Sequence, residues 1–410
     1  MAGAPRRHDL GVEWLRADGR GNDVVVSSRV RMARNFAGFP FPGKSKRVEQ
    51  LQVLEVAQRA IREGEVADKL LWIDLNGLGS LETSVLVERH LISRELAKGG
   101  KPRAVAMSVP DERLAVMVNE EDHLRIQVMK PGLALSEAFD RIDAVDDAIE
   151  NHADYAYSPR FGFLTACPTN VGTGVRVSVM LHLPGLKLGG ELDKVRRAAK
   201  AMSLAVRGFY GEGSEATGDF FQISNQTTLG KSERDLLAEF EQTILPKVVE
   251  YERVARRTLI EKKRVFLEDQ LFRALGTLRH ARLLKTDEVM GLLSLVRLGV
   301  VSGMITDVDL GTVNQLILLV QPAHLQKTAG RALSQSERRV ERASLVRRYM
   351  AADGPSVQAG GVAGDAPPGE GIGGSGGAGP GPAGGNGAGG PVGPSGNGGA
   401  GGSGGSGGGV

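Results

Sequence analysis

The stretch from Phe161 to Leu183 reads FGFLTACPTNVGTGVRVSVMLHL. It holds the only cysteine of the chain, Cys167, which is followed by a Gly-Thr-Gly turn at residues 172–174. From Arg176 onward the polar and apolar residues alternate, which predicts a strand with one buried face. A thiol and a guanidinium therefore flank one tight turn, and the question is which groups they face.

The composition divides the chain into two unequal parts. About half of the 57 glycines fall in residues 351–410, where charges are sparse and aromatic residues do not occur. Such a segment buries too little apolar surface to offset the entropy lost on ordering, so residues 353–410 are predicted to be a disordered Gly/Pro/Ser-rich tail. The remainder is long enough for one large or two ordinary domains.

The net charge and the cysteine content limit the class of protein. A formal net charge of +3 is compatible with anionic ligands but is too small to indicate nucleic-acid binding by itself. One cysteine excludes an internal disulfide framework and suits a reducing compartment. Neither an apolar run of about 18 residues nor a basic-then-apolar leader is found, so the expected location is the cytoplasm.

Hydrophobic periodicity indicates a mixed region followed by a helical one. Strands are expected at 24–35, 70–75, 104–109, 114–119 and 220–225, with a further strand beginning at Arg176. Helices are expected at 47–65, 80–91, 133–152, 188–206 and 232–265, and then at 267–283, 286–298, 308–320 and 334–351. The change to helices alone near residue 266 predicts a second, small all-α domain.

Five arginines of the mixed region adjoin turns or Gly-rich segments. They are Arg29, Arg31, Arg125, Arg176 and Arg207. Guanidinium groups bind phosphate oxygens in pairs and stay charged at neutral pH, so their convergence on one cleft would suit a nucleoside triphosphate. Arg29 and Arg31 could instead mark an exposed basic edge strand. The sequence alone does not establish that the five converge.

Other candidate residues each have a functional and a structural interpretation. Glu120, Glu121 and Asp122 follow one another at the end of an expected strand, where they form either a solvated acidic turn or carboxylates with tuned pKa values. A lone histidine such as His90 more often has a structural role. Cys167 is either a small buried apolar residue or a reactive thiol beside cations.

Four motifs together resemble the guanidino (phosphagen) kinases, such as creatine and arginine kinase. They are SSRVR at 27–31, NEEDHLR at 119–125, CPTNVGTG at 167–174 and the pair Ser224-Asn225. The stretches 162–167, 221–226 and 321–326 are similar to the bacterial protein-arginine kinases of the McsB type in particular. The resemblance covers about residues 10–350.

The resemblance implies an α+β fold. A guanidino-kinase catalytic domain, an antiparallel β-sheet flanked by helices, is expected at residues 10–265. The small all-α C-terminal domain is expected at 266–352, and the tail at 353–410 lies outside the resemblance.

The resemblance also implies roles for individual residues. Glu121 matches the carboxylate that orients the acceptor guanidinium and takes its proton, Cys167 matches a thiol that lies against that guanidinium, and Glu212 matches a second carboxylate. ATP is the implied phosphoryl donor, with Mg²⁺ carried by the nucleotide and no metal ligands from the protein. Nucleotide binding is assigned to Ser27, Ser28, Arg29, Val30, Arg31, His90, Arg125, Arg176, Val177, Ser178, Val179, Met180, Arg207, Gly208, Phe209, Tyr210 and Gly211.

The last expected helix departs from the pattern of the relatives. They carry Arg-Asp-x-x-Arg-Ala, implicated in binding phosphoarginine, whereas this chain has Arg338-Arg339-Val340-Glu341-Arg342-Ala343. Arg339 replaces the acid that would partner a guanidinium, which puts phosphoarginine recognition in doubt. A more general anion site at Arg338 and Arg342 remains as the hypothesis.

The implied function is transfer of the γ-phosphoryl group of ATP to arginine side chains of proteins. The resemblance further implies that such marks send proteins to a Clp-type protease, that a heat-shock repressor is one substrate, that a zinc-binding activator protein is a partner, and that the helical domain forms a homodimer.

Three alternatives remain. A small-molecule arginine kinase is disfavoured because the chain does not match the N-terminal helical domain of the metabolic enzymes. A non-catalytic phosphoarginine-binding adaptor is disfavoured because the expected catalytic positions are filled. Binding of nucleic acid through the basic last helix would make the affinity fall steeply with salt.

Overall fold

The computed structural model of the chain describes residues 12–209, 218–226 and 228–351. The predicted tail and three predicted site residues, Tyr210, Gly211 and Glu212, lie outside these ranges. Within them, none of the helices combines the length and apolar character that crossing a membrane requires.

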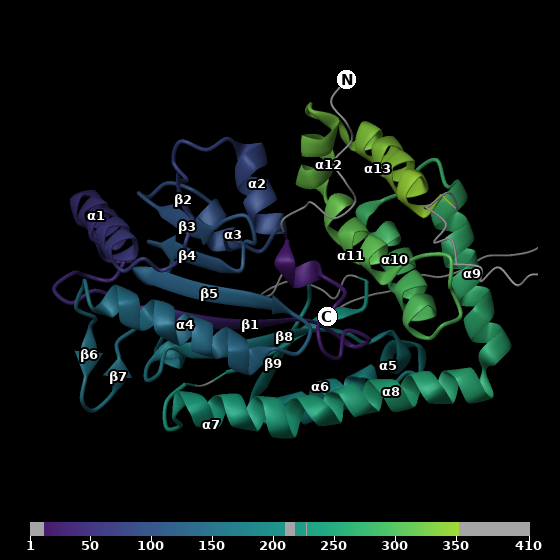
Figure 1. The fold of residues 1–410 in the computed structure, drawn as a ribbon, viewed down its shortest axis with the longest axis horizontal. Helices are drawn as coiled ribbons and strands as arrows, with labels where there is room; N and C mark the ends of the chain where they lie inside the picture. Colours follow the sequence, from purple (N-terminus) through teal and green to yellow (C-terminus); the bar gives the residue numbers. More distant parts are fainter. Residues whose placement is uncertain (1–11, 210–217, 227, 352–410) are drawn as a thin grey trace, which may run out of the picture. The chain divides into compact units, whose positions relative to one another are not determined.

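An antiparallel sheet of eight strands lies at the centre of the fold, in the order β2-β3-β4-β5-β1-β8-β10-β9 (Figure 1). The strands are β1 (Val25–Arg34), β2 (Leu70–Asp74), β3 (Ala104–Ser108), β4 (Leu114–Val118), β5 (Leu124–Pro131), β8 (Val175–His182), β9 (Leu204–Arg207) and β10 (Phe220–Asn225). A separate hairpin of β6 (Tyr157–Ser158) and β7 (Gly162–Phe163) precedes Cys167.

The central strand β1 separates apolar and basic side chains onto opposite faces. Val30 and Met32 are buried in the main hydrophobic core, whereas Arg29 and Arg31 line a cavity on the other face. This follows from the two-residue repeat of a strand. Because β1 pairs with β5 on one side and β8 on the other, its arginines lie in the middle of the sheet.

Helices cover the core face of the sheet. α4 (Leu135–Glu150) packs on β1 and β5, with apolar residues three or four positions apart, such as Leu135, Phe139 and Ile142, turned toward the core. Other helices that contribute to this core include α1 (Arg47–Glu63), α5 (Pro184–Leu188), α6 (Leu192–Ala201) and α8 (Leu245–Lys262). α7 (Glu233–Ala238) and a π-helical turn at Glu239–Ile244 lead into α8.

A smaller apolar cluster fixes two helices against β3 and β4. α2 (Ser80–Glu88) contributes Leu86, α3 (Arg94–Ala97) contributes Leu96, and the loop between them contributes Leu91. These elements lie beside the basic face of the sheet and provide a wall of the cavity described below.

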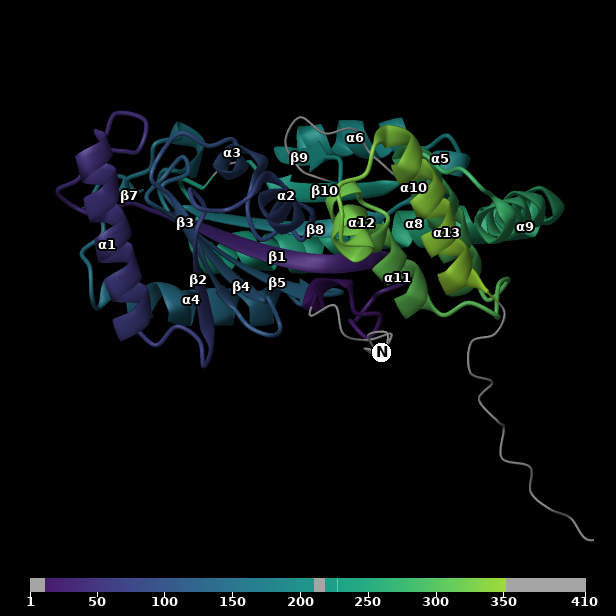
Figure 2. The same ribbon diagram turned by 90° about the horizontal axis from the view of Figure 1, so that it is seen from above.

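The C-terminal part of the described chain is helical (Figure 2). Its helices are α9 (Arg264–His280), α10 (Thr286–Val301), α11 (Leu310–Leu319), α12 (Pro322–Ala329) and α13 (Gln335–Met350). Their core also includes Trp14 and, from the sheet, Met129, Met180 and Phe220. The described residues up to 351 belong to one compact unit, and the domain boundary at residue 265 stays a prediction.

The fold class expected from the resemblance is confirmed, since an antiparallel sheet is flanked by helices and followed by a helical region. Two local predictions were wrong, and one helix was not predicted. Residues 188–206 are not one helix, because α6 ends at Ala201, Ser203 adopts a φ of 55°, and Leu204 begins β9 on the edge of the sheet. His90 lies beyond the end of α2, with a φ of 60°. The sequence also gave no prediction of α12.

Candidate active site

Two of the five candidate arginines lie directly opposite each other on neighbouring strands, and two more lie on other strands of the same sheet. Arg31 of β1 lies directly opposite Arg176 of β8, and on its other side it pairs with Gln127 of β5. Arg125 is two residues before Gln127 on the same face of β5, and Arg207 of β9 pairs with Gln222 of β10. Like charges directly opposite each other destabilise a sheet, so this arrangement needs an anionic partner.

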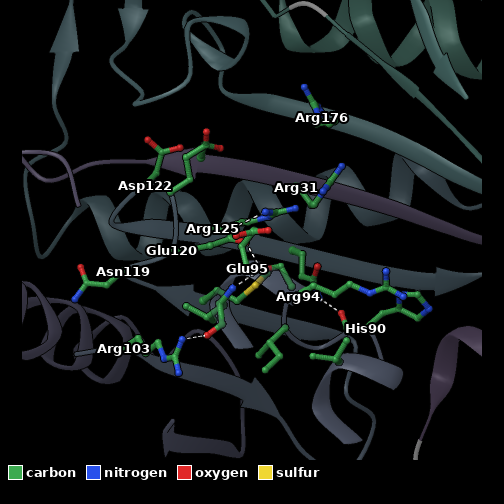
Figure 3. Close-up of a pocket in the computed structure, with 18 of the residues that line it drawn as sticks. Arg31, His90, Arg94, Glu95, Arg103, Asn119, Glu120, Asp122, Arg125 and Arg176 are labelled. Atoms are coloured by element: carbon green, nitrogen blue, oxygen red, sulfur yellow. Dashed lines mark hydrogen bonds and ion pairs between the residues drawn. The ribbon is translucent and has the colours of Figure 1, made fainter. Parts of the chain in front are cut away.

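All five arginines line one cavity of about 1040 Å³ on this face of the sheet. Figure 3 shows Arg31, Arg125 and Arg176 side by side on their strands, with His90 and Arg94 on the opposing wall. The structure thus brings together the residues whose convergence the sequence could not establish. The volume is at the upper end of the range of about 300–1,000 Å³ typical of ligand pockets.

The electrostatics of the arginines indicate an anion site. Burial, together with the charges of Arg125, Arg207 and Arg176, lowers the pKa of Arg29 to about 9. Burial and the same kind of repulsion, chiefly from Arg29, lower the pKa of Arg31. Among the described residues, no group accepts a hydrogen bond from Nε or Nη2 of Arg31. A polyanion in the cavity would relieve this repulsion.

Glu120 and Glu121 have different environments although they are adjacent. Glu120 accepts a bond of 2.6 Å from Nη1 of Arg125 and another from the Ser93 hydroxyl. Burial alone would raise the pKa of Glu120, but Arg125 and these bonds outweigh it and the pKa falls. Burial, and then the charges of Asp122 and Glu120, raise the pKa of Glu121. Glu120 is therefore a fixed anion, whereas Glu121 is suited to accept a proton.

Cys167 lies on a loop that closes onto the cavity. Asn170, three residues later, lines the cavity and accepts a bond of 3.4 Å from Nη2 of Arg176. The turn that follows needs glycine at position 172, where φ is 112° and a Cβ atom would lie 2.7 Å from the Thr228 carbonyl oxygen. The half-buried thiol, with Thr169 Oγ1 3.1 Å from its sulfur, lies on this loop but is not among the residues that line the cavity.

Two buried polar side chains connect the Cys167 loop with the acidic turn. Oδ1 of Asp122 accepts bonds from Asn35 Nδ2 at 2.7 Å and from the Ala166 amide at 2.6 Å. Asn35 also donates to the Leu164 carbonyl at 3.0 Å and accepts from the His123 amide at 2.9 Å.

His90 is held at the cavity wall by aromatic and backbone contacts. Its ring meets those of Trp14 and Phe209 edge-on, with centroids 5.0 and 5.2 Å apart. Trp14 Nε1 donates to the Arg89 carbonyl at 3.3 Å, and Gln127 Nε2 donates to the His90 carbonyl at 2.6 Å. Burial, followed by repulsion from Arg29 and Arg94, lowers the pKa of His90 to about 3. The ring is therefore neutral at physiological pH.

Two comparisons with families of known proteins agree with this geometry. The family described as ATP:guanido phosphotransferase, C-terminal catalytic domain, matches residues 52–255. The family described as Protein-arginine kinase McsB C-terminal domain matches residues 264–359.

Individual relatives match over most of the chain. A protein-arginine kinase of Pelotomaculum thermopropionicum is 45% identical over 341 residues, which are 82% of this chain and 95% of the relative. One of Geobacillus thermodenitrificans is 44% identical over 339 residues, 82% of this chain and 93% of the relative. The chain belongs to the protein-arginine kinase family.

The fold can also be aligned with that of a solved kinase structure. The duplicated taurocyamine kinase of Schistosoma mansoni, with bound transition-state analogue components, aligns with a TM-score of 0.52 at 27% identity, covering 61% of this chain and 36% of that one.

Not every residue to which the resemblance assigns nucleotide binding contributes a side chain to the cavity. Val30, Val177 and Val179 point into the core on the opposite face. Ser28 donates to the Gly132 carbonyl at 2.7 Å and accepts from the Ala134 amide at 3.0 Å, so its hydroxyl is used inside the fold. Ser27, Ser178 and Met180 line a small separate hollow together with Arg29 and His90. Phe209 packs on His90, and neither it nor Gly208 is among the residues that line the arginine cavity.

The predicted anion site on α13 involves a buried arginine. Arg342 is 2% exposed and donates to the carbonyl oxygens of Val320 at 2.8 Å, Leu284 at 2.9 Å and Arg338 at 3.3 Å. Nη1 of Arg338 donates to the Leu333 carbonyl at 2.7 Å. An anion at this place would therefore compete with backbone acceptors. The anion site stays a prediction for this member of the protein-arginine kinase family.

Sequence reasoning missed several residues of the site. Gln127 could have been found, because its two-residue spacing from Arg125 puts it on the same face of β5. Trp14 and Gln222 carry no local signal that would connect them with a cavity. Asp122 belongs to the motif at 119–125 and Asn35 ends the expected strand at 24–35, but only the fold shows that they bond to each other.

Proposed function

We propose that this chain is a protein-arginine kinase that transfers the γ-phosphoryl group of ATP to the guanidinium of arginine side chains in proteins. The observation that carries the proposal is the cluster of five arginines in one cavity, with a raised-pKa carboxylate, Glu121, at the same site. The family relation supports the same reaction, since the relatives carry this activity in their names.

The arginine cluster suits the electrostatic demands of phosphoryl transfer. This reaction mainly requires alignment of the two reactants and neutralisation of charge on the transferring group. In the proposed mechanism Arg29, Arg31, Arg125, Arg176 and Arg207 hold the phosphate oxygens of ATP. The repulsion among these guanidinium groups is then replaced by bonds to the phosphates, so that part of the cost of assembling the cluster is recovered on binding.

Glu121 accounts for the proton that the acceptor must lose. A guanidinium keeps its proton at neutral pH and becomes a nucleophile only as the proton leaves. Glu121 accepts the proton from the attacking nitrogen, a bond forms between this nitrogen and the γ-phosphorus, and the bond from the γ-phosphorus to the bridging oxygen breaks. ADP leaves with the bonding electron pair. Cys167 lies beside the acceptor and helps to hold the planar group in line.

The nucleotide is proposed to bring Mg²⁺ with it. Mg²⁺ is commonly bound through substrate phosphates together with one or two carboxylates. The bound ion would withdraw charge from the β- and γ-phosphate oxygens, while the arginines orient them.

The test is direct detection of the product. Purified protein is incubated with Mg-ATP and either a casein-like unfolded protein or free arginine, and acid-labile phosphoarginine is measured by mass spectrometry under neutral conditions. We expect phosphoarginine on the protein and its loss in Glu121→Ala. Turnover of free arginine alone would instead support a small-molecule arginine kinase. Binding of phosphoarginine without turnover would support an adaptor.

The wider roles are also proposals that rest on the family relation alone. They comprise delivery of marked proteins to a Clp-type protease, phosphorylation of a heat-shock repressor, stimulation by a zinc-binding activator protein, homodimer formation and action in the cytoplasm. The phosphoarginine test above is independent of all of them.

A further inference from the structure

The end of β1 is joined to two segments that are distant in the sequence. Asn35, which follows β1 directly, is 1% exposed and uses all the polar atoms of its side chain. Nδ2 donates to Asp122 Oδ1 at 2.7 Å and to the Leu164 carbonyl at 3.0 Å, and Oδ1 accepts from the His123 amide at 2.9 Å. One amide group therefore connects the strand of Arg29 and Arg31 with the acidic turn and with the Cys167 loop.

Asp122 completes the connection from the other side. The residue is 3% exposed, and the same Oδ1 that accepts from Asn35 also accepts from the Ala166 amide at 2.6 Å. Asp122 is the residue after Glu121, and Ala166 is the residue before Cys167. The backbone on either side of this bond thus carries the proposed proton acceptor and the thiol.

We propose that Asn35 and Asp122 form a latch that fixes the Cys167 loop against the turn of Glu121, so that both groups face one acceptor guanidinium. They are positioning residues, because their polar atoms are engaged inside the fold: Asn35 is not among the residues that line the cavity, and Oδ1 of Asp122, which does line it, accepts from Asn35 and the Ala166 amide. The assignment of this latch to the acceptor rests on the proposed function. The bonding itself does not, which allows the two to be tested separately.

The physical basis of the latch is the burial of its bonds. A neutral hydrogen bond that replaces a bond to water contributes little to the free energy of folding. Removing one partner of a buried pair costs more, because the other partner is left without a hydrogen bond. Buried polar networks in which every group has a partner also fix one arrangement of the backbone. The Cys167 loop has a further anchor, because Thr165 Oγ1 donates to the Cys167 carbonyl at 2.8 Å.

The first test is independent of activity. Hydrogen exchange followed by mass spectrometry is measured on the segment 162–170 of the full chain. We expect exchange at the Ala166 amide to become about tenfold faster or more in Asn35→Ala and in Asp122→Ala, because the bond that protects it is lost or loosened. Asp122→Asn keeps an Oδ1 acceptor of the same shape, so exchange should stay within about threefold of wild type.

A matched control separates the latch from general destabilisation. Asn314→Ala removes another buried amide, which bonds to the Leu15 carbonyl and to Arg297, far from the Cys167 loop in the sequence. Even if Asn314→Ala lowers the melting temperature as much as the latch variants do, it should leave hydrogen exchange in segment 162–170 unchanged. If Asn35→Ala does not fold, the result for Asp122→Ala still decides. Unchanged exchange in both Asn35→Ala and Asp122→Ala would overturn the latch.

The second test asks whether the latch serves the acceptor. In Asn35→Ala and Asp122→Ala we expect kcat on an unfolded protein substrate to fall by about tenfold or more, with KM for ATP within about twofold of wild type. Asp122→Asn should restore most of kcat. Equal losses of ATP affinity and of kcat would show a general structural role and overturn the assignment. If wild type itself forms no phosphoarginine, the proposed function fails, while the exchange result still stands.

Discussion

Arg31 lies at a position where its buried charge lowers the stability of the fold. It is 8% exposed, lies opposite Arg176 across the β1–β8 pair, and has two nitrogens without a partner among the described residues. A buried cation without a counter-charge destabilises a fold, and such strain is concentrated at functional sites. The unliganded protein therefore holds a site that is ready for an anion, at a cost in stability.

The first prediction follows from this cost. Arg31→Met replaces the buried guanidinium with an apolar side chain, so the melting temperature without nucleotide should rise by about 2–4 °C for each kcal/mol of strain removed. The upward shift that ADP or ATP produces in wild type should be lost. Differential scanning fluorimetry measures both. Arg273→Met, at an exposed arginine paired with Asp269 on α9, is the control and should change neither. A lower melting temperature with the nucleotide shift retained would contradict the prediction.

Glu121 makes the pH dependence of the reaction predictable in sign. Burial and the carboxylates of Asp122 and Glu120 raise its pKa above 4.5, while Arg125 and Arg176 oppose the rise. A proton acceptor works in its ionised form, so kcat/KM should fall as the pH drops through this raised pKa. Asp122→Asn removes one of the charges and should move the acid limb to lower pH. An unchanged acid limb in Asp122→Asn would exclude the Asp122 charge as a cause of the raised pKa of Glu121. In Glu121→Gln, which lacks the proton acceptor, kcat should drop by about 10²–10⁴-fold.

The sequence was most informative about residues where a short-range pattern decides their placement. The alternation in β1 is enough to put Arg29 and Arg31 on one face of that strand. It could not show that Asn35 and Asp122 bond across 87 positions, because that depends on how the strands pair. The same limit explains why Arg338 and Arg342 looked equivalent, although Arg342 is buried by contacts with segments around residues 284 and 320.

At the scale of elements, long amphipathic helices could be read from the sequence and edge strands could not. α1 and α4 were expected close to their observed bounds because their apolar residues recur every three or four positions. β9 was taken for the end of a helix, because Leu204–Arg207 is short and becomes a strand only by pairing with β10. α12 was missed because Pro322 and the short length of the helix give a weak periodic signal.

The contact between α2 and α12 leads to a prediction about elements. Glu88, at the end of α2, accepts bonds from the amides of Ala323 at 2.7 Å and His324 at 2.9 Å, and from His324 Nδ1 at 2.7 Å. A carboxylate from one helix thus caps the N-terminus of another, where the helix dipole favours it. Two residues after Glu88, the chain reaches His90 at the cavity wall.

We expect Glu88→Ala to lower the free energy of unfolding by about 1–3 kcal/mol, because buried amide donors of α12 are left without an acceptor. Urea denaturation measures the loss, and hydrogen exchange at residues 323–324 locates it. Glu82→Ala, at an exposed position of the same helix, should change the stability by no more than about 0.5 kcal/mol. Equal effects of the two substitutions would show that the cap contributes nothing.

At the scale of the whole molecule, a buried arginine joins the helical region to the catalytic sheet. Arg297 of α10 is 0% exposed. It donates to Asn314 Oδ1 at 3.2 Å, to the carbonyls of Asn22 at 2.5 Å and Asp23 at 3.2 Å, and to His182 Nδ1 at 2.9 Å. Because Arg297 can only donate, His182 carries its proton on Nε2, which faces Ser294 Oγ at 2.9 Å.

This arrangement predicts that the two regions unfold together. Burial, with a smaller contribution from Arg256, lowers the pKa of Arg297 to about 9, so the group is still charged at neutral pH. Its charge is stabilised by acceptors from both regions rather than by one carboxylate, and removing it leaves buried acceptors on both sides of the interface. Arg297→Ala should therefore lower the free energy of unfolding by about 3–5 kcal/mol and shift the midpoint of a single unfolding transition to lower urea concentration.

The number of transitions is the decisive measurement. Tryptophan fluorescence, which reports Trp14 beneath the helical region and Trp72 on β2, should follow the same curve as circular dichroism in wild type. Arg282→Ala, at an exposed arginine that donates to the His280 carbonyl at 3.1 Å, is the matched control and should leave the midpoint unchanged. Two separate transitions in wild type would mean that residues near 265 divide independent domains. A single transition in wild type that splits in Arg297→Ala would show that this one side chain couples them.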